Sequence, residues 1–215
     1  MAPEAPLPPA VPVNEELRAE LRRRVAVDQE ARRTLDSEAM AAADAANLPW
    51  LRQLIADVGW PGKSLVGEDG AKDAWLLVQH ADRDPAFQRR CLDLLTIAVE
   101  RGEAAAVDQA YLTDRVLLHE GQPQEYGTQA IGRDGRFVAR NLRDPGHVDE
   151  RRAAVGLGPL AEYLASMAEH HAPEPMRVSC PDCEATIEAW PPDESETRTA
   201  SCPDCGLVLT FRLGD

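Results

Sequence analysis

Four cysteines near the C-terminal end of the chain have the spacing of a metal site. They form two Cys-x-x-Cys pairs, Cys180 with Cys183 and Cys202 with Cys205, and 18 residues separate the pairs. Two thiolates in so short a motif bind one ion from a tight turn, and a second such turn completes a tetrahedron. The spacing therefore predicts a four-thiolate Zn²⁺ site.

The segment that carries these cysteines is predicted to fold as a zinc ribbon. The stretches "EATIEAW" and "LVLTFRL" alternate polar and apolar residues as strands do, and Gly206 suits the left-handed turn that such a motif needs. A segment of fewer than 40 residues has too small a core to fold alone. The metal is therefore expected to supply folding free energy, and four thiolates leave no open position for catalysis.

Two alternatives use the same four thiols, namely a redox-active dithiol and an iron–sulfur cluster. The redox alternative lacks the strand–motif–helix setting of a thioredoxin-like site. The fifth cysteine, Cys91, falls on an apolar helical stripe with Phe87, Leu94 and Leu95. We expect Cys91 to be a small core residue, as free cysteines commonly are.

A second group of reactive side chains lies in the segment "WLLVQHADRDPAFQ". His80 falls in the last turn of a predicted helix, and Asp82 follows it closely. Asp84 and Pro85 have the order of a helix N-cap and first helical position. A capping or surface role explains His80 on helix geometry alone, whereas a neutral imidazole near a carboxylate is also a general base near neutral pH.

Polar residues gather in two further short motifs, "AYLTDRV" and "EYGTQ". On a helix the polar members of the first motif share one face, and those of the second lie near a turn. Internal ion pairing and hydrogen bonding explain both motifs nearly as well as a ligand pocket does. The residues concerned are Tyr111, Asp114 and Arg115 in the first motif, and Tyr126, Thr128 and Gln129 in the second.

The ordered series "GWPGKSLVGEDGA", "AWLLVQHAD", "AYLTDRV" and "YGTQ" resembles the bacterial DUF6624 family over roughly residues 15–170. The resemblance implies no reaction, because the family's function is unknown, and the cysteine segment lies outside it. The family's signature positions would be Trp60, Pro61, Val66, Gly67, Gln79, His80, Asp82, Gln88, Tyr111, Asp114, Arg115, Tyr126, Gly127, Thr128 and Gln129.

These motifs together lead us to expect one cleft formed by His80, Asp82, Asp114, Arg115, Tyr126 and Gln129. In an enzyme, His80 would act as the base, Asp82 or Asp114 would orient it, and Arg115 would hold an anionic group. The expected ligand-binding residues are Gln79, Gln88, Tyr111, Tyr126, Thr128 and Gln129. A second metal at the His-x-Asp motif stays open, and no nucleophile elbow, P-loop or dinucleotide fingerprint is present.

Hydrophobic periodicity predicts a mainly α-helical domain with a small β-hairpin, followed by the ribbon. Asn14 is expected to cap the first helix, Pro49 to open a later one, and Asp144 to cap another as Asp84 does. "GWPGKSLVGEDG" is expected to be a loop, and Asp134-Gly135 the turn of the hairpin. The predicted parts are a disordered Pro/Ala-rich tail (1–13), a helical domain (14–171), a linker (172–177) and the ribbon (178–215), with no internal repeat.

The charge balance disfavours nucleic acid as a partner. The net charge is −14, and in the ribbon Arg177, Arg198 and Arg212 face eight acidic residues. We expect a cytoplasmic protein without a membrane span. The favoured function is a binding module for a small molecule or peptide, with the ribbon contacting a protein partner. The alternatives are a hydrolase or transferase that uses His80, and a regulator that contacts nucleic acid through the ribbon.

Overall fold

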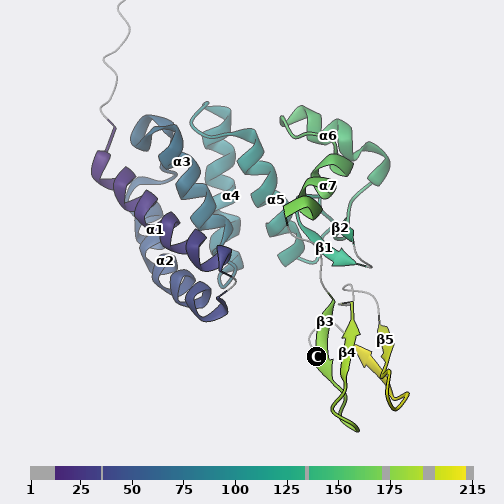
Figure 1. Ribbon diagram of the computed structural model, residues 1–215. Coiled ribbons are helices and arrows are strands. Elements are labelled where there is room, and N and C mark those ends of the chain that lie inside the picture. Colours follow the sequence, from purple (N-terminus) through teal and green to yellow (C-terminus); the bar gives the residue numbers. More distant parts are fainter. Residues whose placement is uncertain (1–12, 35, 134–135, 171–174, 191–196, 212–215) are drawn as a thin grey trace, which may run out of the picture. The chain divides into compact units, whose positions relative to one another are not determined.

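The computed structural model describes residues 13–34, 36–133, 136–170, 175–190 and 197–211 (Figure 1). The chain forms two compact units, Met1–Glu120 and Gly121–Asp215. The fold is mainly α with small two-stranded hairpins, as predicted. No helix in the described part of the chain is long and apolar enough to span a membrane. The predicted tail and linker lie largely outside the described residues, and the predicted domain boundaries stay predictions.

The first unit consists of five helices joined by short connections. Asn14 caps the first helix and Asp84 the fourth, since their side chains accept the N–H groups of Leu17 and Phe87 at 3.0 Å. Both caps were predicted from the sequence. The helices are α1 (Glu15–Arg33), α2 (Ser37–Val58), α3 (Lys63–Gln79), α4 (Pro85–Glu100) and α5 (Ala106–His119).

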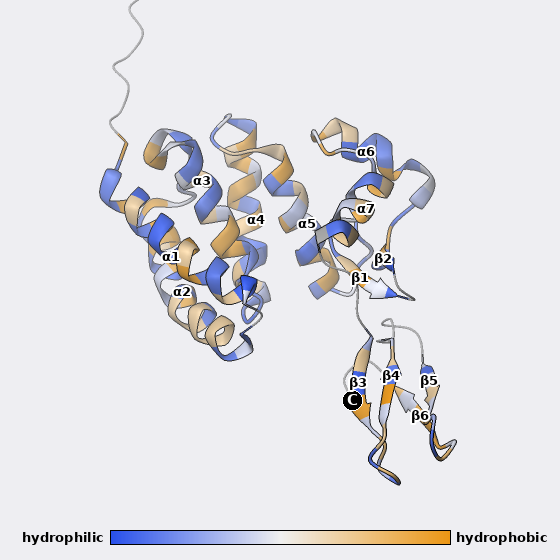
Figure 2. Cartoon of the chain, in the orientation of Figure 1, coloured by the Kyte–Doolittle hydropathy of each residue, from blue (hydrophilic) through white to orange (hydrophobic). Residues whose placement is uncertain are grey.

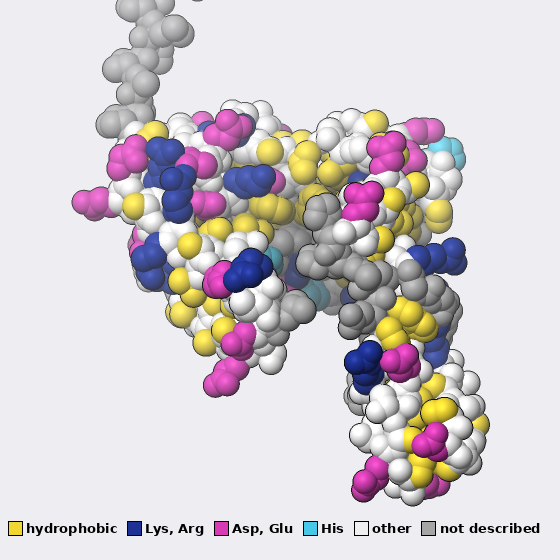
Figure 3. All heavy atoms as spheres, viewed as in Figure 1, with side chains coloured by type: hydrophobic (Ala, Val, Ile, Leu, Met, Phe, Trp, Pro, Cys, Tyr) yellow, Lys and Arg dark blue, Asp and Glu magenta, His cyan; other side chains and the backbone are white. Residues whose placement is uncertain are grey.

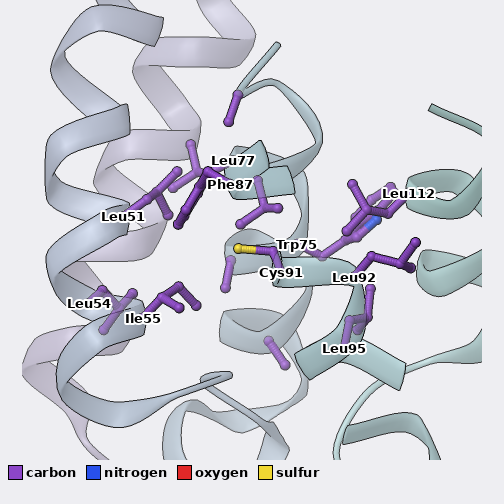
Figure 4. Close-up of a cluster of buried hydrophobic side chains, with 14 of the residues drawn as sticks. Leu51, Leu54, Ile55, Trp75, Leu77, Phe87, Cys91, Leu92, Leu95 and Leu112 are labelled. Atoms are coloured by element: carbon purple, nitrogen blue, oxygen red, sulfur yellow. The ribbon is translucent and has the colours of Figure 1, made fainter. Parts of the chain in front are cut away.

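The core of this unit lies where α2, α3, α4 and α5 meet (Figure 4). Leu51 and Ile55 come from α2, Trp75 from α3 and Leu95 from α4. Cys91 lies among them and is fully buried, as expected, and burial raises the pKa of its thiol to about 12. Figure 2 shows that α1 is largely hydrophilic, whereas α4 carries more hydrophobic residues, so α4 is a main contributor to the core.

Pro49 does not open a helix, contrary to the prediction. It lies inside α2, which runs unbroken from Ser37 to Val58. A proline in a helix interior removes one backbone hydrogen bond and costs about 3 kcal/mol. The buried stripe of α2 continues across it, with Asn47 before and Leu51 after. Burial on both sides of Pro49 keeps the helix continuous, because packing stabilises helices in proteins more than propensity does.

The predicted glycine-rich loop is also partly wrong, because α3 already begins at Lys63. Glu103, in the connection from α4 to α5, caps this start. Its carbonyl accepts the Lys63 N–H at 2.9 Å, and its carboxylate accepts the Ser64 N–H at 2.8 Å. The glycine signal corresponds instead to a break within α3 at Gly67, where φ is +78°. A cap from a distant segment therefore decides where this helix begins.

The second unit begins with the predicted β-hairpin. Strands β1 (Ala130–Arg133) and β2 (Arg136–Ala139) pair antiparallel, and their predicted turn lies outside the described residues. The buried Gln124 fixes the base of the hairpin, because its side chain bonds to the backbone of Gln129 and Arg140. Two helices, α6 (Val148–Ala154) and α7 (Leu160–His170), follow a short 3-10 helix (Pro145–His147).

Asp144 does not cap a helix as Asp84 does, so that prediction is wrong. Its backbone is left-handed, with φ of +39°, and its side chain caps no N–H group. The carboxylate of Asp144 instead lies 2.8 Å from Nδ1 of His147. The left-handed backbone directs the carboxylate to this side chain rather than to the free N–H groups at the helix start.

The cysteine segment forms two further hairpins of the expected β type. Strand β3 (Met176–Ser179) pairs with β4 (Thr186–Ala189), and β5 (Arg198–Ser201) pairs with β6 (Val208–Phe211). Its small core contains Cys180, Ile187 and Cys202. The sequence "SCPDC" stands at residues 179–183 and again at 201–205. The two hairpins are therefore a short repeat, so the prediction of no internal repeat is wrong.

Candidate functional site

The four cysteine sulfur atoms lie together as a metal site requires. All four are within 4.8 Å of one another. Sγ of Cys180 lies 3.6 Å from Sγ of Cys205, and Sγ of Cys183 lies 3.5 Å from Sγ of Cys202. A disulfide needs about 2.05 Å between its sulfurs, so these cysteines are free thiols. Sulfurs at about 2.3 Å from a tetrahedral ion lie about 3.8 Å apart, and the observed cluster fits that arrangement.

Each pair of cysteines lies on its own backbone turn, and the two turns have the same hydrogen-bond pattern. In the first turn the Cys180 N–H donates to the carbonyl of Ala185 at 2.8 Å, and the Glu184 N–H donates to the carbonyl of Cys180 at 2.9 Å. In the second turn the equivalent bonds join Cys202 to residue 207 and Gly206 to Cys202. Residues 184 and 206 both have positive φ, +63° and +77°. The sequence predicted this left-handed position for Gly206 only.

The backbone also favours the thiolate form at one cysteine. The N–H of Cys205, together with that of Asp204, lowers the pKa of Cys202 to about 7. The Ala185 N–H is the largest single influence on Cys183 and acts in the same direction, but the neighbouring thiols and burial together outweigh it and raise the pKa of Cys183 to about 12. The pKa of Cys205 is also raised, so Cys183 and Cys205 need a cation to lose their protons, and metal binding will release protons.

A second polar cluster lies in the first unit, around Asp82. The Asp82 carboxylate accepts a hydrogen bond from Gln88 at 3.1 Å and forms an ion pair with Arg115 at 2.6 Å. His119 lies 3.8 Å from the same carboxylate. Gln79 donates to the carbonyl of Tyr111 at 3.5 Å. The structure thus brings five predicted residues into one network across α3, α4 and α5.

Several polar atoms of this network are buried without a hydrogen-bond partner among the described residues. They are Oε1 of Gln79, Oε1 of Gln88 and Nε of Arg115. Gln79 is only 4% exposed and Gln88 is fully buried. Leaving one such group unpaired costs about 1–3 kcal/mol. A water molecule or a ligand that pairs with these atoms would remove this cost.

His80 belongs to a different network, centred on Asp28 of α1. Nδ1 of His80 lies 2.8 Å from Oδ2 of Asp28. Nε of Arg32 lies 3.1 Å from Oδ1 of Asp28 and 2.9 Å from the His80 Nδ1. The Arg32 guanidinium also reaches Asp44 of α2 at 2.8 Å. In the structure, Asp28 rather than Asp82 or Asp114 is the carboxylate bonded to His80.

Burial and charge act in opposite directions on the two carboxylates of this network. Burial raises the pKa of Asp28, but the hydrogen bonds from His80 and Gln29 and the charge of Arg32 outweigh it, so the net shift is downward. Asp28 is therefore a buried carboxylate held in its ionised form. For Asp44, burial is the largest influence and raises the pKa despite the charge of Arg32.

The remaining predicted residues are divided between the two units. Asp114 is fully buried in α5. In the second unit the Tyr126 carbonyl accepts from the buried Arg152 at 2.8 Å, and the Thr128 carbonyl accepts from the Tyr163 hydroxyl at 2.9 Å. The Gln129 side chain donates to the Thr128 hydroxyl at 3.1 Å. The convergence of these residues with His80 on one cleft stays a prediction.

Asp28, Arg32 and Asp44 were not predicted from the sequence as site residues. The sequence does contain a signal for Asp28. This residue continues the apolar stripe of Leu21 and Val25 at the helical spacing i, i+4, i+7. A carboxylate on a buried stripe requires a partner. The sequence does not say which partner, since His80 is 52 residues away.

Charged side chains on the surface do not form a strong basic patch on the face shown in Figure 3, where basic residues lie among acidic ones. In the ribbon, Arg177 is paired with Glu188 at 3.1 Å. Neither feature resembles the clustered positive charge of a nucleic-acid surface.

Comparison with known proteins gives one match. The model of a family described as a family of unknown function (DUF6624) matches residues 24–172. No curated protein and no solved structure matches the chain. The matched residues include both polar networks of the first unit, whereas the four cysteines lie outside them.

Proposed function

The chain belongs to the DUF6624 family, and we propose from its own geometry that it is a zinc-binding protein with a ligand-binding helical part. The observation that carries the zinc proposal is the cluster of four cysteine sulfurs within 4.8 Å. Four thiolates in a tetrahedron are the usual ligands of structural Zn²⁺. The ribbon core is too small to fold without help, so the ion stabilises the fold.

Metal analysis of the purified protein tests this proposal. We expect about one equivalent of zinc per chain, and its loss in Cys180→Ser and in Cys205→Ser. Cys91→Ser is the matched control, because Cys91 lies in the helical core and should leave the zinc content unchanged. If the analysis finds iron, and the protein absorbs visible light, the four cysteines hold an iron–sulfur cluster and not zinc. A metal-free protein whose ribbon gives the same dispersed NMR spectrum would refute the proposal.

For the helical part, we propose binding of a small molecule or a peptide at the cluster around Asp82. The supporting observation is the set of buried, unpaired polar atoms on Gln79, Gln88 and Arg115. A ligand that pairs these atoms gains their hydrogen bonds without having to desolvate them. The arrangement offers two acceptors and one donor beside an ion pair, which suits a ligand with amide or hydroxyl groups.

Native mass spectrometry and a structure of the protein as purified test this binding role. We expect a small molecule or peptide that contacts Arg115, and its loss in Arg115→Ala. Arg89→Ala is the matched control, because Arg89 forms a solvent-exposed pair with Glu120 at 2.5 Å. The protein is also incubated with a cell extract of metabolites and peptides before its structure is determined. If water molecules alone occupy all three unpaired atoms, the proposal is contradicted.

The ribbon is proposed to contact a protein partner rather than nucleic acid, because its charge is mainly negative. A titration with DNA and RNA at low salt should show no binding. Measurable binding that weakens with salt would instead support a nucleic-acid regulator. The compartment we propose is the cytoplasm, since free thiols persist there.

A further inference from the structure

We propose that Asp28 and His80 form a base dyad in which Asp28 fixes the imidazole as its Nδ1–H tautomer and Nε2 removes a proton from a ligand. This proposal concerns catalysis, so it goes beyond the binding and zinc roles above and does not depend on either. Asp28 is the positioning residue, and His80 is the group that would contact the substrate.

The contacts around Nδ1 decide the tautomer. If Nδ1 carries the proton, it donates to Oδ2 of Asp28 at 2.8 Å, and the Arg32 Nε–H donates to Oδ1 of the same carboxylate at 3.1 Å. If Nδ1 lacks the proton, it accepts the Arg32 Nε–H at 2.9 Å, but its lone pair then faces the ionised Asp28 oxygen at 2.8 Å, which is repulsive. Gln29 supplies a further N–H to Oδ2 at 2.8 Å. The first arrangement leaves Oδ1 of Asp28 as the acceptor for the Arg32 Nε–H and avoids two acceptors facing each other, so we assign Nδ1–H.

Burial makes this pair different from an ordinary surface contact. Asp28 is 1% exposed and the His80 side chain is 14% exposed. The chain holds a matched pair at Asp144 and His147, whose Nδ1–carboxylate distance is also 2.8 Å, but whose side chains are 57% and 63% exposed. A charge-assisted hydrogen bond is stronger where water is excluded. Only the buried pair should therefore hold one tautomer.

The other ring nitrogen of His80 is available. Nε2 has no hydrogen-bond partner among the residues that the structure describes, and it is not among their buried, unpaired polar atoms. The imidazole is thus anchored at Nδ1 and reaches solvent at Nε2. This is the arrangement of a general base that a carboxylate orients.

The charges around His80 indicate the class of ligand. Asp28, Asp44 and Asp82 all act on this region electrostatically, and Arg32 is the cation that acts with them. Asp82 is paired with Arg115. This leaves Asp28 and Asp44 against Arg32, and this excess of negative charge disfavours a polyanionic ligand. The dyad is therefore suited to a neutral or cationic molecule with an O–H or N–H group. The proton moves from that group to Nε2, the ligand keeps the electron pair, and Asp28 stabilises the resulting imidazolium.

Long-range ¹H–¹⁵N NMR on uniformly labelled, full-length protein at pH 8 tests the tautomer directly. We expect a protonated Nδ1 and an unprotonated Nε2 for His80, and a mixture of tautomers for His147. Asp28→Asn should shift His80 away from the Nδ1–H form, whereas Asp144→Asn should leave it unchanged. The wild-type spectrum is decisive even if Asp28→Asn fails to fold, because an Nε2–H tautomer at His80 would overturn the proposal.

Reaction with diethyl pyrocarbonate tests whether Nε2 is an accessible base, which a purely structural pair would not provide. Nε2 attacks a carbonyl of the reagent, forms a C–N bond and expels ethyl carbonate, and mass spectrometry locates the product. We expect His80 to react in the folded protein, and Asp28→Asn to slow the reaction, because a neutral amide holds the Nδ1–H tautomer less strongly than a carboxylate does. An unmodified His80 in folded protein, or equal rates in both proteins, would refute the dyad.

Discussion

Replacing Glu184 by glycine should strengthen metal binding. Glu184 and Gly206 occupy equivalent places after the second cysteine of each pair, and both have left-handed backbones. Each donates its N–H to the carbonyl of the first cysteine of its pair, at 2.9 and 3.0 Å respectively. The same turn is therefore made once by a residue suited to it and once by a residue that is not.

The size of the effect follows from the backbone conformation. A left-handed conformation costs a residue with a side chain about 1–2 kcal/mol, and glycine returns about 0.5–1 kcal/mol of this through its freer unfolded chain. The expected net gain for Glu184→Gly is thus about 1 kcal/mol. Because folding of the ribbon is coupled to metal binding, this gain appears as metal affinity that is about fivefold higher.

Competition with a chromophoric zinc chelator measures the affinity. Glu184→Ala is the control, since it removes the same charge and keeps the unfavourable conformation, so the comparison of glycine with alanine isolates the backbone. Gly206→Ala is the mirror experiment and should weaken binding about fivefold. An added Cβ at Gly206 meets nothing within 4 Å, so no steric clash contributes. Equal affinities for the glycine and alanine variants at position 184 would refute the reasoning.

Three further predictions concern the thiols and the helices of the first unit. Four thiols should react with a disulfide reagent once a chelator removes the metal, whereas Cys91 should react only after denaturation, because it is buried and its pKa is about 12; five fast thiols would contradict this. Burial raises the pKa of Asp108 to about 6, so the folded state holds its proton more tightly than the unfolded state and stability should fall as pH rises from about 4 to 6. Asp108→Asn should remove this fall and stabilise the protein at pH 7 by about 1 kcal/mol in urea titrations, after allowance for screening; an unchanged pH profile would count against it. Leu95→Ala should cost about 2–5 kcal/mol of unfolding free energy, since Leu95 is fully buried, whereas Ile97→Ala on the exposed side of α4 should cost much less, and similar losses for both would show that the core is placed wrongly.

The features that the sequence predicted correctly depend on residues close together in the chain. The cysteine pairs are short motifs whose geometry the local turn dictates. The caps at Asn14 and Asp84 depend on a side chain and an N–H three residues later. The hairpin follows from the two short segments of β character on either side of Asp134-Gly135. In each case no distant segment has to be known.

The predictions that failed depend on distant contacts. Glu103 determines where α3 begins, and it lies 39 residues beyond Ser64, whose N–H it accepts. Burial on α1 and α3 keeps α2 continuous through Pro49, although the local preference favours a helix start there. Tertiary packing of a few kcal/mol overrides such preferences, which are individually small.

The base dyad combines one residue that local sequence features identified with one that only a distant contact reveals. His80 was identified from its position at a helix end, and the aspartates nearest in sequence were the natural candidates to orient it. Asp82 is 46% exposed and paired with Arg115, and Asp114 is buried in α5, whereas the carboxylate that lies 2.8 Å from His80 is the buried Asp28. A carboxylate stays ionised at such burial only if donors surround it, and His80, Gln29 and Arg32 are those donors. A charged residue on an otherwise apolar helical stripe is thus the feature to search for when a histidine needs a partner, because burial rather than sequence distance makes that partner effective.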